Sequence, residues 1–243
     1  MSDNPKRPVV MSDETKRQLN ATSTATLAGQ LQRRGIRSAF MGGLKASHPD
    51  KRMLGYARTL RYVALREDLA PKLQAGGVNA QRRAVESLGP EDVLVIEARN
   101  EAHAATIGDI FVMRSLQLGA TGIVSDGGLR DTPAIYGIDI PVYHFSSHAA
   151  TLGRLHMPYE VDNGVTCAGC FVEVGDIIVG DGEGAIVIPA ALVEEVARDA
   201  FVQEEEETFA VERVATGEPT VGLFPLSKER RPDFEAWKAA RAK

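Results

Sequence analysis

Asp109, Arg130 and Asp131 are the residues of this chain whose types and spacing could perform chemistry. Twenty residues separate Asp109 from the adjacent pair. The pair follows a β-branched run and two glycines (GIVSDGGLRDTP, residues 122–133), a pattern that an exposed turn would also produce. The placement of Asp109 favours a site instead. It opens a segment with helical spacing, and a helix start can meet the carboxyl end of the following strand in one α/β layer.

Each of these residue types suits one part of a 2-oxo acid. The unpaired backbone N–H groups at the predicted helix start, on Ile110 and Phe111 after Gly108, suit a substrate carboxylate. Arg130 is a planar, permanently charged donor for a ketone oxygen or for the enolate that develops from it. Asp131 offers a hard oxygen ligand to Mg²⁺ or Mn²⁺, with water filling most of the octahedron. Together these groups would stabilise an enolate, and we expect Gly108, Asp109, Ile110, Phe111 and Arg130 to contact the substrate.

Apolar periodicity predicts the elements that must position these residues. Apolar side chains at helical spacing indicate an amphipathic helix over 108–119. Residues 122–126 form the strand that follows, and the glycine pair after it is expected to break that strand. Further strands are predicted at 53–65, 93–98 and 138–145, and two or three more with tight turns within 171–189.

The remaining elements flank this centre. A helix is predicted over 23–35, with Ser23 as a candidate N-cap and glycine at its end. A long helix is predicted over 190–217, and a short terminal helix is expected to be anchored by Phe234 and Trp237. Strand–helix–strand order in the middle, followed by strand–turn–strand, predicts a mixed α/β sandwich.

Composition and charge limit the classes of partner. The net charge is −5 and the isoelectric point is about 5.6, without a basic stripe, so nucleic acid is not an expected partner. No apolar run approaches the ~20 residues of a membrane span. Because the first residues also lack the apolar core of a secretory signal, we expect a cytoplasmic protein. We expect one domain over 11–225, between a disordered stretch over 1–10 and a helical tail over 226–243.

Two short motifs favour structural roles. Cys167 and Cys170 have the spacing of a metal or redox pair, but no second ligand pair is near and a strand follows. Two small buried residues are therefore the favoured interpretation. The glycine-rich residues 180–184 precede a strand rather than a helix, so they predict a hairpin turn and not a dinucleotide loop.

Three histidines and two arginines leave open a second metal site and a second substrate-binding site. His144, His148 and His156 could form a metal site, although they do not share one helix face. Arg61 and Arg66 could bind a second substrate carboxylate or hydroxyl groups. Surface ion pairs with the acidic residues at 67 and 68 are the favoured interpretation of these arginines.

Three stretches of the sequence resemble the RraA-like family (regulator of ribonuclease activity A). They are GDIFVMRSLQLGATGIVSDGGLRDTP, VGDIIVGDGEGAIVIP and QEEEETFAVERVATGEPTVGLFP. The likeness runs from about residue 12 to 240, and the C-terminal tail resembles a longer branch of the family. The family includes class II pyruvate aldolases that act on 4-hydroxy-4-methyl-2-oxoglutarate and 4-carboxy-4-hydroxy-2-oxoadipate. The resemblance implies an αββα sandwich assembled into trimers, sometimes hexamers, with sites between subunits.

The resemblance also implies a role for each residue that matches the family motif. Asp109 would organise metal-bound water, Arg130 would bind the keto oxygen, and Asp131 would ligate Mg²⁺ or Mn²⁺. A glutamate from the C-terminal helix of a neighbouring subunit would act through water, and gapless spacing places it within one acidic run. The candidates in that run are Glu204, Glu205, Glu206 and Glu207. Without the resemblance, such a run is more typical of a solvated helix face.

The predicted function is a metal-dependent lyase that acts on 2-oxo acids. It would cleave a 4-hydroxy-2-oxo acid to pyruvate through an enolate, and it would also decarboxylate oxaloacetate because the same enolate arises there. A dehydratase or decarboxylase of a sugar-derived 2-oxo acid is an alternative on the same metal centre. A regulator that binds a ribonuclease without catalysis is a second alternative, but the presence of Asp131 favours an enzyme.

Overall fold

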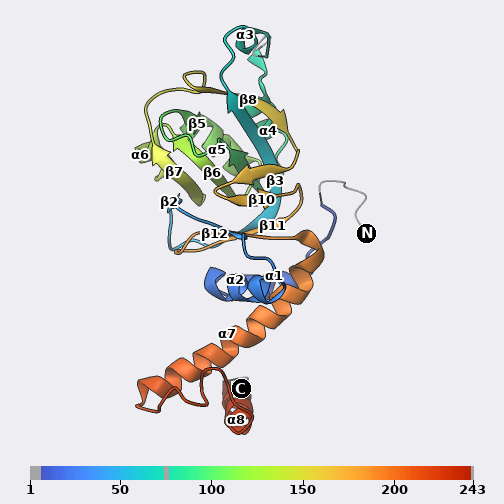
Figure 1. Cartoon of the computed structure of the whole chain (residues 1–243), viewed down its shortest axis with the longest axis vertical. Helices are drawn as coiled ribbons and strands as arrows, with labels where there is room; N and C mark the ends of the chain where they lie inside the picture. Colours follow the sequence, from blue (N-terminus) through green and yellow to red (C-terminus); the bar gives the residue numbers. More distant parts are fainter. Residues whose placement is uncertain (1–6, 74–76, 242–243) are drawn as a thin grey trace.

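A curled, mixed β-sheet forms the centre of the computed structural model, which describes residues 7–73 and 77–241 (Figure 1). Along the sheet the strands are β1 (Phe40–Met41), β12 (Ala185–Ile188), β11 (Ile177–Gly180), β3 (Met53–Ala64), β4 (Asp92–Glu97), β6 (Gly122–Leu129), β7 (Val142–Ser147) and β2 (Lys45–Ala46). Off this path, β5 (Ala105–Ile107) pairs with β6 and β8 (His156–Val161) pairs with β3. A separate hairpin consists of β9 (Val165–Cys167) and β10 (Cys170–Val172).

Both faces of the sheet are covered by packed side chains. Successive side chains of β4 show this, because they belong alternately to two hydrophobic cores. Val93 and Val95 belong to one hydrophobic core, whereas Leu94 and Ile96 belong to the other. Successive side chains of a strand point to opposite faces, so a run without polar residues needs a layer on each side. The mixed α/β sandwich predicted from the sequence is therefore confirmed, and structural relatives described below share it.

The described part of the chain contains eight α-helices and a 3₁₀ turn besides the strands. They are α1 (Asp13–Asn20), α2 (Thr24–Arg33), α3 (Ala70–Leu73), α4 (Ala80–Glu86), α5 (Asp109–Gln117), α6 (Thr132–Ile135), η2 (Ala190–Leu192), α7 (Val193–Ala215) and α8 (Arg231–Arg241). Local signals placed several of them correctly. Ser23 caps α2 by accepting the Thr26 N–H at 3.1 Å, and Gly35 follows this helix with a φ of 84°.

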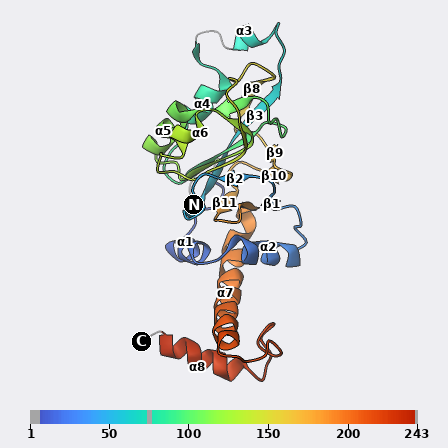
Figure 2. The same cartoon turned by 90° about the vertical axis from the view of Figure 1, so that its left-hand side faces the viewer.

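Helix α7 projects from the body like an arm, and α8 packs near its far end (Figures 1 and 2). Its first turns belong to the body: Val193, Val196 and Ala200 are buried in the same core as α2. The outer half joins a small separate cluster formed by Phe209, Ala210, Leu223 and Phe234, with Trp237 packed against it. The predicted terminal helix and its two aromatic anchors are thus present.

Strand β6 differs from the prediction, because it continues through Gly127 and Gly128 to Leu129. The glycines permit close approach of a neighbouring segment instead of forming a turn. A Cβ on Gly127 would lie 2.6 Å from the Cβ of Ala98, and one on Gly128 would lie 2.9 Å from the Ala104 carbonyl oxygen. The strand predicted over 138–145 also differs: β7 begins only at Val142, after Pro141, which has no N–H to donate to a ladder.

The N-terminal region contains structure that the sequence patterns did not predict. Disorder was expected over 1–10; residues 1–6 lie outside the described residues, but Arg7 donates to the Asp92 carboxylate at 2.8 Å. Val9 packs against the larger core. Helix α1 was not predicted either, although Ser12 caps it by accepting the Thr15 N–H at 3.0 Å. Contacts with the sheet and with α7 (Val193–Ala215), which local sequence patterns do not specify, hold this segment in place.

Candidate active site

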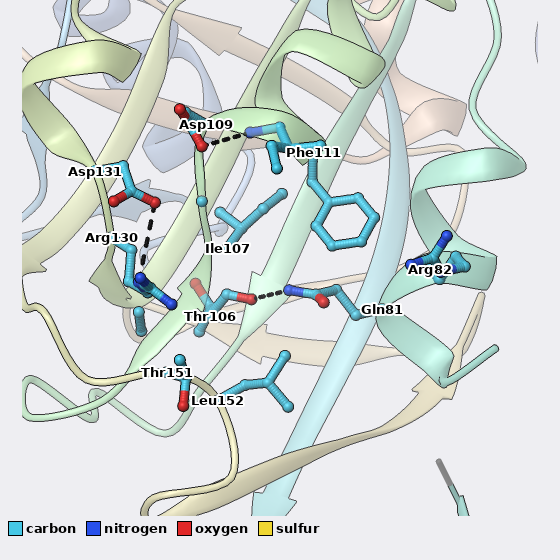
Figure 3. Close-up of a pocket in the computed structure, with 13 residues that line it drawn as sticks. Gln81, Arg82, Thr106, Ile107, Asp109, Phe111, Arg130, Asp131, Thr151 and Leu152 are labelled. Atoms are coloured by element: carbon cyan, nitrogen blue, oxygen red, sulfur yellow. Dashed lines mark hydrogen bonds and ion pairs between the residues drawn. The ribbon is translucent and has the colours of Figure 1, made fainter. Parts of the chain in front are cut away.

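A pocket of about 270 Å³ opens where α5 begins and β6 ends (Figure 3). All six residues that the sequence marked as the core of a site line it, and these are Gly108, Asp109, Ile110, Phe111, Arg130 and Asp131. A backbone hydrogen bond joins the ends of β5 and β6, since the Arg130 N–H, just after β6, donates to the carbonyl oxygen of Ile107, the last residue of β5, at 3.0 Å. Asp109 and the pair Arg130–Asp131, which are distant in the sequence, therefore line the same pocket.

The start of α5 presents backbone donors to this pocket. Gly108 is the N-cap residue and has no side-chain cap. The Asp109 carboxylate accepts the N–H of Ile110 at 2.8 Å. One of the two N–H groups predicted to bind a substrate carboxylate is thus already paired within the chain, which the sequence did not indicate. The first turn of a helix carries unpaired N–H groups and a positive dipole end, so the site still favours an anion.

Asp131 has a backbone conformation that most residues avoid. Its φ is 55° in the left-handed region, where a short polar side chain is tolerated better than most. Its carboxylate oxygen Oδ2 lies 3.9 Å from Nε of Arg130, and both side chains are 41% exposed. A Cβ on Gly108 would lie 2.9 Å from the same Oδ2. The carboxylate therefore occupies space that only glycine at position 108 leaves open.

The donor set fits a hard divalent cation. Mg²⁺ and Mn²⁺ prefer oxygen ligands, and Mg²⁺ usually keeps several waters and takes only one or two carboxylates from the protein. Asp109 and Asp131 supply two carboxylates to the pocket, and the space above Gly108 accommodates one of them. Within residues 7–73 and 77–241, no group of three or more His, Cys, Asp and Glu side chains is placed to hold a metal. A metal ion bound here would take its other ligands from water, substrate or another chain.

The acidic run on α7 does not reach this pocket within one chain. Glu204 accepts from the backbone N–H and hydroxyl of Ser23, both at 3.2 Å. The other three glutamates have partners as well: Glu205 pairs with Lys238 at 2.7 Å, Glu206 with Arg231 at 2.5 Å, and Glu207 accepts from Gln203 at 2.7 Å. The contact was predicted for a neighbouring subunit, so it stays a prediction.

Seven residues of the pocket lining were missed by the sequence patterns. They are Gln81 and Arg82 from α4, Ala105, Thr106 and Ile107 from β5, and Thr151 and Leu152 from the loop before β8. Neither α4 nor β5 was predicted. A signal for α4 exists, because Asn79 is a good N-cap residue and its side-chain oxygen accepts the Arg82 N–H at 2.9 Å.

The three histidines have separate structural roles. His144 is buried and bonded to the Tyr136 hydroxyl at 2.9 Å, while the buried His156 is bonded to the Ala105 carbonyl at 3.2 Å. Burial lowers the pKa of both imidazoles. His148 uses Nδ1 to accept the Ala150 N–H at 3.0 Å. The described residues thus give no support to the metal site that these histidines could have formed.

The interpretation of the cysteines as small buried residues is confirmed. Cys167 and Cys170 face each other across the β9–β10 hairpin as buried free thiols. Burial raises the pKa of the Cys170 thiol to about 11, which makes it a poor nucleophile and metal ligand. The glycine-rich residues 180–184 form the predicted turn between β11 and β12.

The two arginines considered for a second carboxylate lie in ion pairs. Arg66 pairs with Asp68 at 2.7 Å, as the favoured interpretation stated. Arg61 instead pairs with Glu160 of the adjacent strand β8 at 2.9 Å, because antiparallel pairing places these residues opposite each other. Neither arginine lines the pocket.

Comparisons with known proteins agree with this fold. A family model described as RraA-like (Aldolase/RraA) matches residues 24–187. A protein of Halalkalibacterium halodurans with the provisional name 4-hydroxy-4-methyl-2-oxoglutarate aldolase is 29% identical over 162 residues, which cover 65% of this chain and 69% of the relative. A protein of Deinococcus radiodurans with the same provisional name is 28% identical and covers 45% and 68% of the two chains.

Solved structures show the same architecture. Streptomyces coelicolor RraAS2, described as an unusual member of the RNase ES inhibitor RraA protein family, superposes with a TM-score of 0.74 at 31% identity. The match covers 84% of this chain and 97% of that one. An uncharacterised protein of Pseudomonas syringae shares the fold with a TM-score of 0.76 at 21% identity, and the match covers 88% of this chain and 98% of that one.

No helix in the described part of the chain is long and apolar enough to cross a membrane.

Proposed function

Because the chain belongs to the RraA-like family, we propose that it is a divalent-metal-dependent lyase that cleaves a 4-hydroxy-2-oxo acid to pyruvate and decarboxylates oxaloacetate. The observation that carries the proposal is the convergence of Asp109, Arg130 and Asp131 on one pocket at a helix start. The provisional aldolase names of two relatives support it. Mg²⁺ or Mn²⁺ is the proposed cofactor, with Asp131 as its direct protein ligand.

The residues of the pocket divide the work on the substrate. The first turn of α5 receives the carboxylate, and Arg130 donates to the 2-oxo oxygen. In aldol cleavage the C4 hydroxyl passes its proton to water and becomes the carbonyl group of the departing product. The C3–C4 bond breaks, and its electrons form the enolate of pyruvate. Protonation at C3 then completes pyruvate. The Arg130 interaction strengthens as charge accumulates on the enolate oxygen, so it lowers the barrier. When bound, the metal ion adds positive charge that polarises the 2-oxo group.

Assembly of identical chains is part of the same proposal. Helix α7 carries Glu204–Glu207 away from the pocket of its own chain (Figure 1). We therefore place one of these side chains in the pocket of another copy, within a trimer or hexamer in which Asp109 and this glutamate act through water.

Two substitutions test the assignment. Arg130→Ala is expected to lower kcat for pyruvate release by about 10²–10³-fold, the usual loss of one oxyanion donor, with a smaller effect on KM. Asp131→Ala should abolish both activity and metal stimulation. Neither change should alter Tm much, since both side chains are 41% exposed. Arg198→Ala is a matched control, because Arg198 also lies beside an aspartate, at 3.0 Å, but outside the pocket. Near-normal, metal-stimulated turnover by Asp131→Ala would place the active site elsewhere.

A regulatory function is the second candidate, favoured by the 31% identity to RraAS2. It predicts binding to a ribonuclease that is unaffected by metal removal or by Asp131→Ala. Absence of pyruvate release from any 2-oxo acid, together with such binding, would select it. A panel that includes sugar-derived 2-oxo acids separates the aldolase from a dehydratase or decarboxylase on the same centre.

A further inference from the structure

Arg82 lies in the pocket wall on the other side of Phe111 from Arg130 and Asp131 (Figure 3). Its guanidinium carbon is 5.7 Å from the centroid of the Phe111 ring. The pocket thus has a cationic side chain on each of two opposite walls and an aromatic ring between them. A short ligand with an anionic group at each end matches this arrangement.

The backbone of Arg82 is held firmly in position. Its N–H donates to the side-chain oxygen of Asn79 at 2.9 Å, which caps α4. The side-chain amide of Gln81 donates to the Thr106 carbonyl oxygen, which also accepts the Tyr62 hydroxyl at 2.6 Å. Because Gln81 is buried, the first turn of α4 is anchored to β5. The backbone of Arg82 is therefore fixed relative to the pocket, and only its side chain needs to adjust to a ligand.

Arg82 forms no close ion pair within the described part of the chain. Glu86 lies one turn later on the same helix, and its pKa is lowered mainly by the hydrogen bond from Arg114 and also by the charge of Arg82. Glu86 accepts two hydrogen bonds from Arg114, at 3.0 and 2.8 Å. An arginine on a surface can remain solvated without any function. At Arg82, however, the guanidinium lines the candidate active site and is available to a ligand anion.

We propose that Arg82 binds a second anionic group of the substrate, a carboxylate or a phosphate, at the end away from the 2-oxo acid. This inference rests on the proposed function for the orientation of the substrate. A planar guanidinium donates two parallel hydrogen bonds to either group. Arg82 thereby makes the pocket selective for dianionic 2-oxo acids over monoanionic ones of equal length.

Ligand binding tests the proposal without requiring turnover. In Mg²⁺ buffer, calorimetry would compare 2-oxoglutarate with 2-oxopentanoate, which has the same chain length and one carboxylate fewer. A hydrogen bond to a charged group contributes ~1.5–3 kcal/mol, so the dianion should bind about 10-fold or more tightly. The phosphonate 2-oxo-4-phosphonobutanoate distinguishes a phosphate from a carboxylate as the preferred distal group.

Variants then assign the selectivity to Arg82. Arg82→Gln should weaken binding of 2-oxoglutarate about 10-fold and leave 2-oxopentanoate unchanged, while Arg82→Lys should retain part of the preference. Arg83→Gln is the matched control, since Arg83 is the next residue of α4 and does not line the pocket. Equal Kd values for the two acids in the wild-type protein, or equal losses in the Arg82 and Arg83 variants, would overturn the inference.

Turnover separates this proposal from the proposed function. Pyruvate release from 4-hydroxy-2-oxoglutarate and from 4-hydroxy-2-oxopentanoate gives the same comparison in kcat/KM. If neither acid is cleaved but Arg82 still selects the dianion in binding, the lyase assignment fails and the Arg82 subsite stands. If both acids are cleaved with equal kcat/KM and bind equally well, the lyase stands and the subsite fails.

Discussion

Replacement of Gly108 by alanine displaces the candidate metal ligand without replacing any charged or polar side chain of the site. An ideal Cβ at position 108 lies 2.9 Å from Oδ2 of Asp131 and 3.8 Å from Cβ of Arg130. Carbon and oxygen atoms rarely approach closer than ~3.2 Å without a hydrogen bond, so the carboxylate must move by several tenths of an ångström. The backbone of Gly108, with φ −125° and ψ 179°, is ordinary for alanine and needs no change.

The size of the effect follows from these distances. A metal site tolerates errors of ~0.2 Å in its ligand distances, and Mg²⁺ demands near-ideal geometry. Disturbing the orientation of a ligand typically costs ~10–100-fold in metal affinity or activity. The Asp131 side chain is 41% exposed and can rotate into solvent, so the cost in stability is only ~0.5–1.5 kcal/mol. A gain of ~0.4–1 kcal/mol from restricting the unfolded chain offsets most of it.

Titration of the protein with Mn²⁺ is therefore expected to show ~10–100-fold weaker binding in Gly108→Ala, with Tm changed by only a few degrees. The apparent activation constant for Mn²⁺ in pyruvate release should rise in parallel. Gly29→Ala is the control, because Gly29 lies in α2 and a Cβ there meets no atom within 4 Å. Wild-type Mn²⁺ affinity in Gly108→Ala would refute the assignment of the Asp131 carboxylate as the metal ligand.

Two further predictions concern the framework. Burial raises the pKa of Asp181, but hydrogen bonds from Thr24 and Glu183 and the charge of Arg52 outweigh it, so the net shift is downward. At pH values above the ordinary aspartate pKa the ionised carboxylate stabilises the fold, and this stabilisation is lost as pH falls through the lowered pKa. In urea melts, Asp181→Asn should therefore lose ~1–3 kcal/mol of unfolding free energy at pH 7, and the loss should shrink in acid. A difference from the wild-type protein that does not change with pH would contradict this. Phe234→Ala should remove ~3–5 kcal/mol of stability from the separate cluster between α7 and α8. Amide hydrogen exchange should therefore accelerate in α8, while the Tm of the sheet domain stays unchanged. An equal loss of stability in the sheet domain would contradict the independence of the cluster.

Short-range patterns determined several elements before any tertiary contact was known. The helix predicted over 108–119 is α5, and Gly119 ends it with a φ of 89°. The long helix predicted over 190–217 is η2 and α7, followed by Gly217 with a φ of 95°. Caps, apolar periodicity and terminal glycines act within one or two turns, so their signals are contained in the local sequence.

Glycine and buried polar residues in β6 required the tertiary structure for their interpretation. Gly127 and Gly128 have the residue type of a turn, but the Ala98–Ala104 segment lies against them. Asp126 has the residue type of a loop, yet it is buried and accepts N–H groups from Ala98 and Ala168, the latter at 3.3 Å. Both cases depend on a partner segment distant in sequence, which local patterns do not specify.

The candidate site divides in the same way. The sequence by itself determined that Asp109, Arg130 and Asp131 belong together, because one strand and one helix connect them along the chain. Only the tertiary structure decided that Arg82 completes the pocket and that the Asp131 carboxylate rests above Gly108. Parallel pairing of β5 with β6 and the anchoring of α4 on β5 set those contacts. Such contacts are decided by sheet register and packing across the whole chain, so no single stretch of sequence encodes them.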